Sequence, residues 1–166
     1  VVVAVAPTLW GPGLWHVLFV TAWNARDDQA EALRSLVFDV VPKVIPCPTC
    51  RNHFRQNFVR ACREAGDRPS TGRAMFVWLY HMKRAVNVRL RTPSIALQSL
   101  TQRFEFHSGA LDAVLLADTL LLLAMATVDD DNAAAIVDDS SRGTSVSDFL
   151  HMCRLLSELL PFDHAE

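Results

Sequence analysis

Two cysteines separated by two residues, Cys47 and Cys50, stand in the stretch IPCPTCRNHF at residues 45–54. Proline is tolerated in the first turn of a helix, because the amide donor that it lacks would have no partner there. Pro48 therefore predicts that a helix begins at the pair. Amide donors and the dipole at a helix N-terminus stabilise a thiolate, so the spacing indicates a redox-active pair.

The spacing alone leaves other chemistries open. Zinc takes four nitrogen or sulfur ligands, and Cys47, Cys50, His53 and Cys62 are ligands of these types. However, one helix over 48–65 would place Cys62 roughly 18 Å from Cys50 at about 1.5 Å per residue, so we predict no metal site. A structural disulfide without catalysis is the third alternative. A thioredoxin-like fold would require a βαβ unit, and the sequence shows no strand pattern of useful length.

The composition is that of one globular domain. The chain has 166 residues, of which 51% are hydrophobic, and it carries 16 basic against 18 acidic residues. This balance excludes nucleic acid as an expected partner. The longest apolar run, AVLLADTLLLLAMATV, contains Asp118 and is too short for a membrane span, so we expect a buried helix there. The opening VVVAVA is too short for a signal peptide.

Apolar residues recur at helical spacing almost throughout, which predicts an all-α fold. The first four helices are expected over 8–25, 28–44, 48–65 and 71–91, with Pro42 kinking or ending the second. Further helices are expected over 95–106, 109–128, 132–138 and from Ser145. Short loops between helices predict an antiparallel bundle over 1–93, and 94–166 forms additional C-terminal helices that pack on the bundle or on a dimer partner.

We make further predictions for the helix over 109–128 and for the helix that begins at Ser145. A helix over 109–128 that is apolar nearly all round should be covered on all sides. Ser145 and Asp148 stand at the spacing of a capping box for the last helix. The inward face of that helix is expected to include Val146, Phe149, Leu150, Cys153 and Leu160.

Three stretches, taken together, resemble the Erv/ALR family of FAD-linked sulfhydryl oxidases. They are WGPGLWHVLFVTA at 10–22, IPCPTCRNHF at 45–54 and WLYHMKRAVNVRL at 78–90. Their order and approximate spacing are similar to the family pattern WxxLHxxA, YPCxxCxxHF and WxxxxHNxVNxxLxKP over residues 10–93. The Trp-Gly-Pro entry and single CxxC look most like members encoded by large DNA viruses. The resemblance implies a four-helix bundle that holds FAD beside the CxxC, and a homodimer.

The resemblance also implies roles for individual residues. Cys50 would be the cysteine next to the flavin, and Cys47 the cysteine that exchanges with substrate. The expected cofactor-binding residues are Trp10, Trp15, Phe19, His53, Phe54, Trp78, Lys83, Arg84, Val86, Asn87 and Leu90.

The chain departs from the family pattern at several of these positions. Phe19 replaces the histidine of WxxLH, Lys83 and Arg84 replace the His-Asn pair, and Thr92 replaces a lysine. Phe19 can still pack on a cofactor, and the two cations can pair with a pyrophosphate. The alternative interpretation is that the aromatic residues form part of the core and that the cations lie on a solvated face.

The function implied is an FAD-dependent thiol oxidase that takes electrons from protein dithiols through Cys47 and Cys50 to FAD and then to O2, giving H2O2. The alternatives are a helical interaction module that has lost the cofactor and a zinc-binding CxxC module. The resemblance leaves the compartment open: host-cell cytoplasm or virion for a viral member, an oxidising organelle otherwise. Cys62 and Cys153 lie outside the motif, and the sequence leaves open whether they pair.

Overall fold

The computed structural model describes residues 6–65, 68–106, 110–128 and 144–160, and it confirms the all-α fold. The first part contains α1 (Pro7–Asn24), η1 (Asp27–Gln29), α2 (Ala30–Arg34), η2 (Ser35–Val40), α3 (Val41–Val44), α4 (Pro48–Ala65) and α5 (Gly72–Leu90). The second contains α6 (Leu97–Phe106), α7 (Ala113–Met125), β1 (Thr127–Val128), β2 (Thr144–Ser145) and α9 (Val146–Leu159). The two strands form only a short parallel pair.

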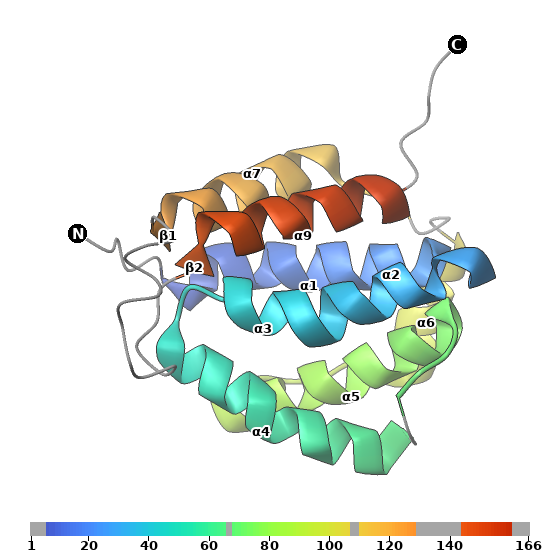
Figure 1. The fold of residues 1–166 in the computed structure, drawn as a ribbon. Helices are drawn as coiled ribbons and strands as arrows, with labels where there is room; N and C mark the ends of the chain where they lie inside the picture. The colour runs from blue at the N-terminus through green and yellow to red at the C-terminus, as the bar shows by residue number, and fades with distance from the viewer. Residues whose placement is uncertain (1–5, 66–67, 107–109, 129–143, 161–166) are drawn as a thin grey trace.

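The helices lie in layers (Figure 1). At the bottom of the view α4 packs along α5, and α5 packs in turn against α1. The run from α2 to α3 lies in front of α1, and α7 and α9 cover the top. Contacts between α7 and α1, and between α9 and the run from α2 to α3, join the C-terminal helices to the others.

The second expected helix continues through Pro42 to Val44, so the predicted early end was wrong, and a change of helix type before the proline replaces it. The π-helical turn η2 widens the helix just before this proline, and the amide of Val41 donates to the carbonyl of Leu36, five residues back. Pro42 then stands in the first turn of α3, where a missing amide donor costs nothing. The helix therefore reaches Val44, close to the cysteine pair.

Two glycines allow helices to approach closely. A Cβ atom on Gly72, at the start of α5, would lie 2.5 Å from the carbonyl oxygen of Ala22 and 2.9 Å from that of Ala25 in α1 and its C-cap. A Cβ atom on Gly13 of α1 would overlap Thr119 of α7. The absence of a side chain at these positions brings α5 and α7 onto α1.

One face of α7 is buried and the other is exposed. Leu116, Thr119 and Leu123 are buried. By contrast Val114 is 72% exposed and Leu121 is 61% exposed, and Met125 is similarly open. The helix packs on the bundle through one face, as predicted, and the single chain leaves the other face uncovered.

The last helix begins as predicted but turns a different face inward. The side chain of Ser145 accepts a hydrogen bond from the amide of Asp148, so the predicted cap is confirmed. Of the residues expected on the inward face, Leu160 is buried and Phe149 packs against the core, whereas Val146 is 36% exposed and Leu150 is 59% exposed. The buried stripe consists of Met152, Leu155, Leu156 and Leu159, which leaves Leu150 on the opposite side of the helix. The helix expected over 132–138 lies outside the described residues.

Among the helices of the described segments, none combines the length and the apolar character that crossing a membrane requires.

Candidate functional site

The two cysteines of the CxxC motif form a disulfide at the N-terminus of α4, with Cα atoms 5.1 Å apart. Cys47 directly precedes the helix, and Cys50 lies in its first turn. The amide of Cys50 donates to Sγ of Cys47 at 3.2 Å, and the amide of Arg51 donates to the Cys47 carbonyl at 2.9 Å. A thiolate on Cys47 would therefore meet an oriented donor and the positive end of the helix dipole.

Residues far along the chain hold the segment that leads to the disulfide. Thr144 Oγ1 lies 3.3 Å from the carbonyl oxygen of Lys43 and 3.2 Å from that of Val44, within hydrogen-bonding distance of both. Lys43 Nζ also lies 3.6 Å from a carboxylate oxygen of Asp148 at the start of α9. The end of α3, three residues before Cys47, is thus fixed by β2 and α9.

The other two cysteines are free thiols, and both are half-buried. Trp78 Nε1 donates a hydrogen bond to Sγ of Cys62 at 3.4 Å. Burial raises the pKa of the Cys153 thiol, which lowers its reactivity at neutral pH. Within the described segments, no group of three or more His, Cys, Asp and Glu side chains gathers in a way that could hold a metal ion.

His53 lies one turn beyond Cys50 and has a buried nitrogen, Nδ1, with no hydrogen-bond partner among the described residues. Buried polar atoms in folded proteins nearly always have a partner. This atom next to the redox pair is placed to make a polar contact with a ligand.

Three of the predicted cofactor-binding residues meet where α1 and α5 pack together. Lys83 Nζ lies 5.3 Å from the centre of the Trp15 ring, and Trp15 lies 6.2 Å from Phe19. Burial lowers the pKa of Lys83, and in the described part of the chain no carboxylate lies within 4 Å of its ammonium. A half-buried cation beside aromatic rings fits a planar ligand that carries a phosphate.

Phe19 is more enclosed than the sequence suggested. Its ring lies 5.1 Å from Phe76 of α5 and 6.2 Å from Phe104 of α6, in an edge-on aromatic cluster. Only 6% of Phe19 is exposed. Phe19 is therefore a core residue that packs against Trp15.

The remaining predicted residues are dispersed. Trp10 and Trp78 are buried in the core, and Trp78 packs edge-on against Phe38 and Phe58. Arg84 is exposed and lines a shallow cleft with Arg60, Val86 is half-buried, and Leu90 is 54% exposed. These residues thus differ in exposure, from the buried tryptophans to the open Arg84 and Leu90.

Asn87 has a structural partner at the end of α5. Its Nδ2 donates to the carbonyl of Pro93 and lies 3.1 Å from Ser94 Oγ, while the amide of Thr92 donates back to the Asn87 carbonyl. These bonds close the helix at Arg91, which has a left-handed backbone with φ of 55°. Asn87 thus stabilises the turn that follows α5.

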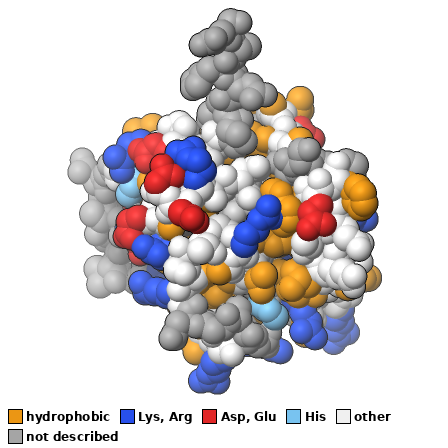
Figure 2. Space-filling view, turned by 90° about the vertical axis from the view of Figure 1, so that its right-hand side faces the viewer, with side chains coloured by type: hydrophobic (Ala, Val, Ile, Leu, Met, Phe, Trp, Pro, Cys, Tyr) orange, Lys and Arg blue, Asp and Glu red, His pale blue; other side chains and the backbone are white. Residues whose placement is uncertain are grey.

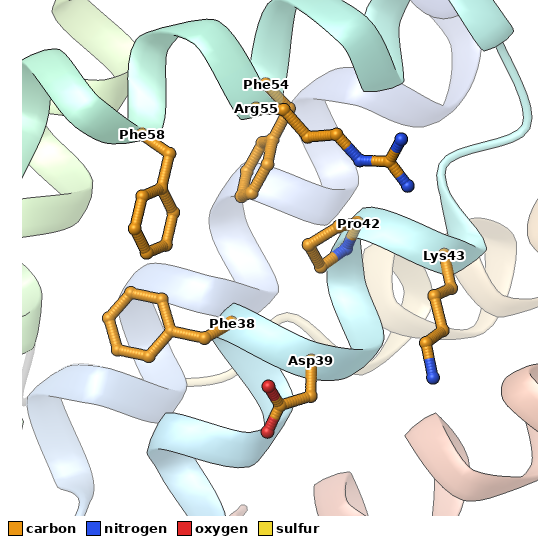
Figure 3. Close-up of a pocket in the computed structure, with 7 residues that line it drawn as sticks. All are labelled: Phe38, Asp39, Pro42, Lys43, Phe54, Arg55 and Phe58. Carbon is orange, nitrogen blue, oxygen red and sulfur yellow. The ribbon is translucent and has the colours of Figure 1, made fainter. Parts of the chain in front are cut away.

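Phe54, predicted to bind the cofactor, lines a pocket between α4 and the helix before it (Figure 3). The other lining residues are Phe38, Asp39, Pro42, Lys43, Arg55 and Phe58. Sequence reasoning missed this pocket. The available signal was the spacing of Cys50, Phe54 and Phe58, which puts two phenylalanines on the same helical stripe as the redox pair.

Comparison with known proteins agrees with the site. The profile of the Erv1 / Alr family matches residues 12–105, which include the disulfide, Trp15 and Lys83. A protein of Invertebrate iridescent virus 3, named "putative FAD-linked sulfhydryl oxidase", is 26% identical over 104 residues, which cover 61% of this chain and 69% of that protein. No solved structure shows a significant match. With more than half of its length matched by the family profile, the chain belongs to the Erv1 / Alr family.

Proposed function

We propose that the protein is an FAD-dependent thiol oxidase that forms disulfides in protein substrates. The observation that carries the proposal is the Cys47–Cys50 disulfide at the N-terminus of α4, with the Cys50 amide directed at the Cys47 sulfur. Membership of the Erv1 / Alr family and the name of the viral relative support the same activity.

The chain's own residues account for the exchange with substrate. A substrate thiolate attacks Sγ of Cys47, the Cys47–Cys50 bond breaks, and Cys50 leaves as a thiolate. A second substrate thiolate then attacks the substrate sulfur of this mixed disulfide and releases Cys47. The substrate gains a disulfide and loses two electrons and two protons, and the pair becomes a dithiol. The Cys50 amide stabilises the departing Cys47 thiolate.

Four residues fit an FAD cofactor. Trp15, backed by Phe19, offers an aromatic wall, Lys83 offers a cation for the pyrophosphate, and the buried Nδ1 of His53 offers a polar contact near the disulfide. When bound, FAD accepts the two electrons of the Cys47/Cys50 dithiol and passes them to O2, which gives H2O2.

The exposed face of α7 supports a homodimer. Val114, Leu121 and Met125 are seven and four residues apart, so they lie on one side of the helix. Large apolar side chains gathered on one surface commonly mark an interface. A second copy that packs on this face would cover the side of α7 that its own chain leaves open.

The first experiment is the visible absorption spectrum of the purified protein together with oxidase assays of cysteine variants. We expect a flavin spectrum and O2 consumption with dithiothreitol. Cys47→Ser and Cys50→Ser should each abolish turnover, while Cys153→Ser, which removes a thiol outside the motif, should retain it. A protein that stays colourless with added FAD, or full activity in either motif variant, would overturn the proposal.

A further inference from the structure

The pocket between α4 and the helix before it has a volume of about 590 Å³. Its two ends carry different side chains (Figure 3): the rings of Phe38 and Phe58 lie at one end, and Arg55 and Lys43 lie toward the other. The two rings pack edge to face with their centres 5.1 Å apart, and both contact Trp78. Asp39 also lines the pocket, and its carboxylate points away from α4.

The pocket continues directly from the disulfide. Cys50, Phe54 and Phe58 are spaced four residues apart on α4, so they form one stripe along the helix. At about 1.5 Å per residue, Phe54 lies about 6 Å and Phe58 about 12 Å from Cys50 along the axis. Lys43 precedes Cys47 by four residues, so the cationic end is the end nearer to the sulfurs.

The part of the chain that supplies α4 and α5 is strongly basic. Residues 40–104 contain twelve Lys and Arg but only two acidic residues, Glu64 and Asp67, although the whole chain has a net charge of −2. Figure 2 shows the end of the molecule away from the disulfide, where the lower part of the face, at the level of α4 and α5 in Figure 1, also carries basic but no acidic side chains. Such a field attracts acidic partners and repels basic ones.

We propose that this pocket binds the protein substrate beside its reacting cysteine. An apolar side chain of the substrate enters the pocket and packs against the joined rings of Phe38 and Phe58, and an acidic residue nearer to the cysteine contacts Arg55. Lys43, which lies 3.6 Å from Asp148, adds positive charge at the same end. Phe54 and Phe58 follow Cys47, where the substrate sulfur attacks, by seven and eleven residues, which is about 10 Å and 16 Å along the axis. An extended chain advances about 3.3 Å per residue, so the apolar residue stands about three to five positions from the cysteine. This inference rests on the proposed oxidase function, and it names the class of substrate.

The pocket and the residues that fit the cofactor are separate. Trp15 and Lys83 belong to α1 and α5, and neither lines the pocket. A substrate in the pocket would therefore leave Trp15 and Lys83 open to the cofactor.

The test compares two dithiol peptides with dithiothreitol as substrates of the holoenzyme. One peptide carries Glu next to a cysteine and Phe three positions from it, and the matched peptide carries Lys and Ser there. The variants are Arg55→Glu and, as a control, Arg63→Glu, which reverses an exposed charge two turns further along α4 outside the pocket. Binding of the Glu/Phe peptide with both cysteines replaced by serine is measured separately by fluorescence anisotropy.

We expect the wild type to prefer the Glu/Phe peptide about tenfold in kcat/KM, mainly through KM. In Arg55→Glu, kcat/KM for this peptide relative to dithiothreitol should fall about tenfold and the serine peptide should bind correspondingly more weakly, whereas Arg63→Glu should leave both unchanged. Equal losses of kcat/KM in Arg55→Glu and Arg63→Glu, or equal kcat/KM for the two peptides, would contradict the proposal that the pocket binds substrate. A wild type that does not oxidise dithiothreitol contradicts the oxidase itself, and the anisotropy measurement still decides whether the peptide binds at Arg55.

Discussion

The amide of Cys50 donates a hydrogen bond to Sγ of Cys47 over 3.2 Å, so the first sulfur of the pair caps α4. Cys50 lies within the first turn and has no equivalent donor described. A helix N-terminus stabilises negative charge most strongly at its cap. The two cysteines are therefore unequal as thiolates, although they belong to one disulfide.

In the reduced protein, we expect iodoacetamide to modify Cys47 before Cys50, because Cys47 carries the better stabilised thiolate. Peptide mapping by mass spectrometry after brief labelling at neutral pH measures the order. Cys153, whose pKa is raised by burial, should react more slowly than Cys47 and serves as an internal reference. Faster labelling of Cys50 would contradict the assigned roles.

Lys83→Met should weaken FAD binding about tenfold or more, because a charge-assisted contact to phosphate contributes about 1.5–3 kcal/mol. Titration of the apoprotein with FAD, followed by flavin fluorescence, measures the change. Arg89→Met removes an exposed cation of the same helix and should leave the affinity close to that of the wild type. Equal affinities for the wild type and Lys83→Met would remove Lys83 from the cofactor site.

The same lysine makes the stability of the apoprotein depend on pH. Burial lowers the pKa of Lys83 in the folded state, so the unfolded chain binds more protons between this value and the ordinary lysine pKa of about 10.4. The contribution of Lys83 to the free energy of unfolding therefore increases as the pH rises through that window. At pH values below the window, Lys83 is charged in both states and the full cost of burying its charge remains. Urea denaturation from pH 7 to pH 10 should show the wild type gaining stability relative to Lys83→Met. A constant difference would contradict the burial of the ammonium.

Gly72→Ala should lower the free energy of unfolding by about 1–3 kcal/mol, because the new methyl group would press on the carbonyl oxygens of Ala22 and Ala25. Gly11→Ala is the control, since a Cβ atom there would meet nothing within 4 Å. Gly11 lies inside α1, so its replacement should be neutral or stabilise by up to about 1 kcal/mol. Chemical denaturation of both variants measures the difference, and similar values would show that α1 and α5 do not approach so closely.

Leu121→Glu should convert a dimer into a monomer, because it places a charge on the exposed apolar face of α7. Size-exclusion chromatography with light scattering reports the mass. Val88→Glu is a matched control, since Val88 on α5 and Leu121 are each 61% exposed. A monomeric wild type, or dissociation by both variants alike, would rule out α7 as the dimer interface.

Features that depend on local backbone chemistry could be predicted from the sequence. Pro48 begins α4 as expected, and Thr71 caps α5 by accepting a hydrogen bond from the amide of Ala74. Ser145 caps α9 in the same way. Each of these residues acts on amide groups within one turn, so no knowledge of the distant chain is required.

Features that depend on packing between distant segments could not be predicted. Leu150 lies on one of two apolar stripes of α9, and only contact with the run from α2 to α3 selects the stripe of Met152 and Leu156. The pocket likewise joins Phe38 and Lys43 to Phe54 of another helix. The CxxC motif predicted that Phe54 lies near the cysteines, but it did not predict which residues of the preceding helix line the pocket opposite Phe54.

The contact between Thr144 and the end of α3 links the position of the disulfide to a distant part of the chain. Thr144 and Asp148 contact Lys43 and Val44 although they lie about a hundred residues further along the chain. The geometry of the cysteine pair therefore depends on a segment outside the CxxC motif. A substitution at Thr144 or Asp148 would leave the cysteines, the aromatic residues and Lys83 unchanged, yet it would loosen the backbone that leads to Cys47.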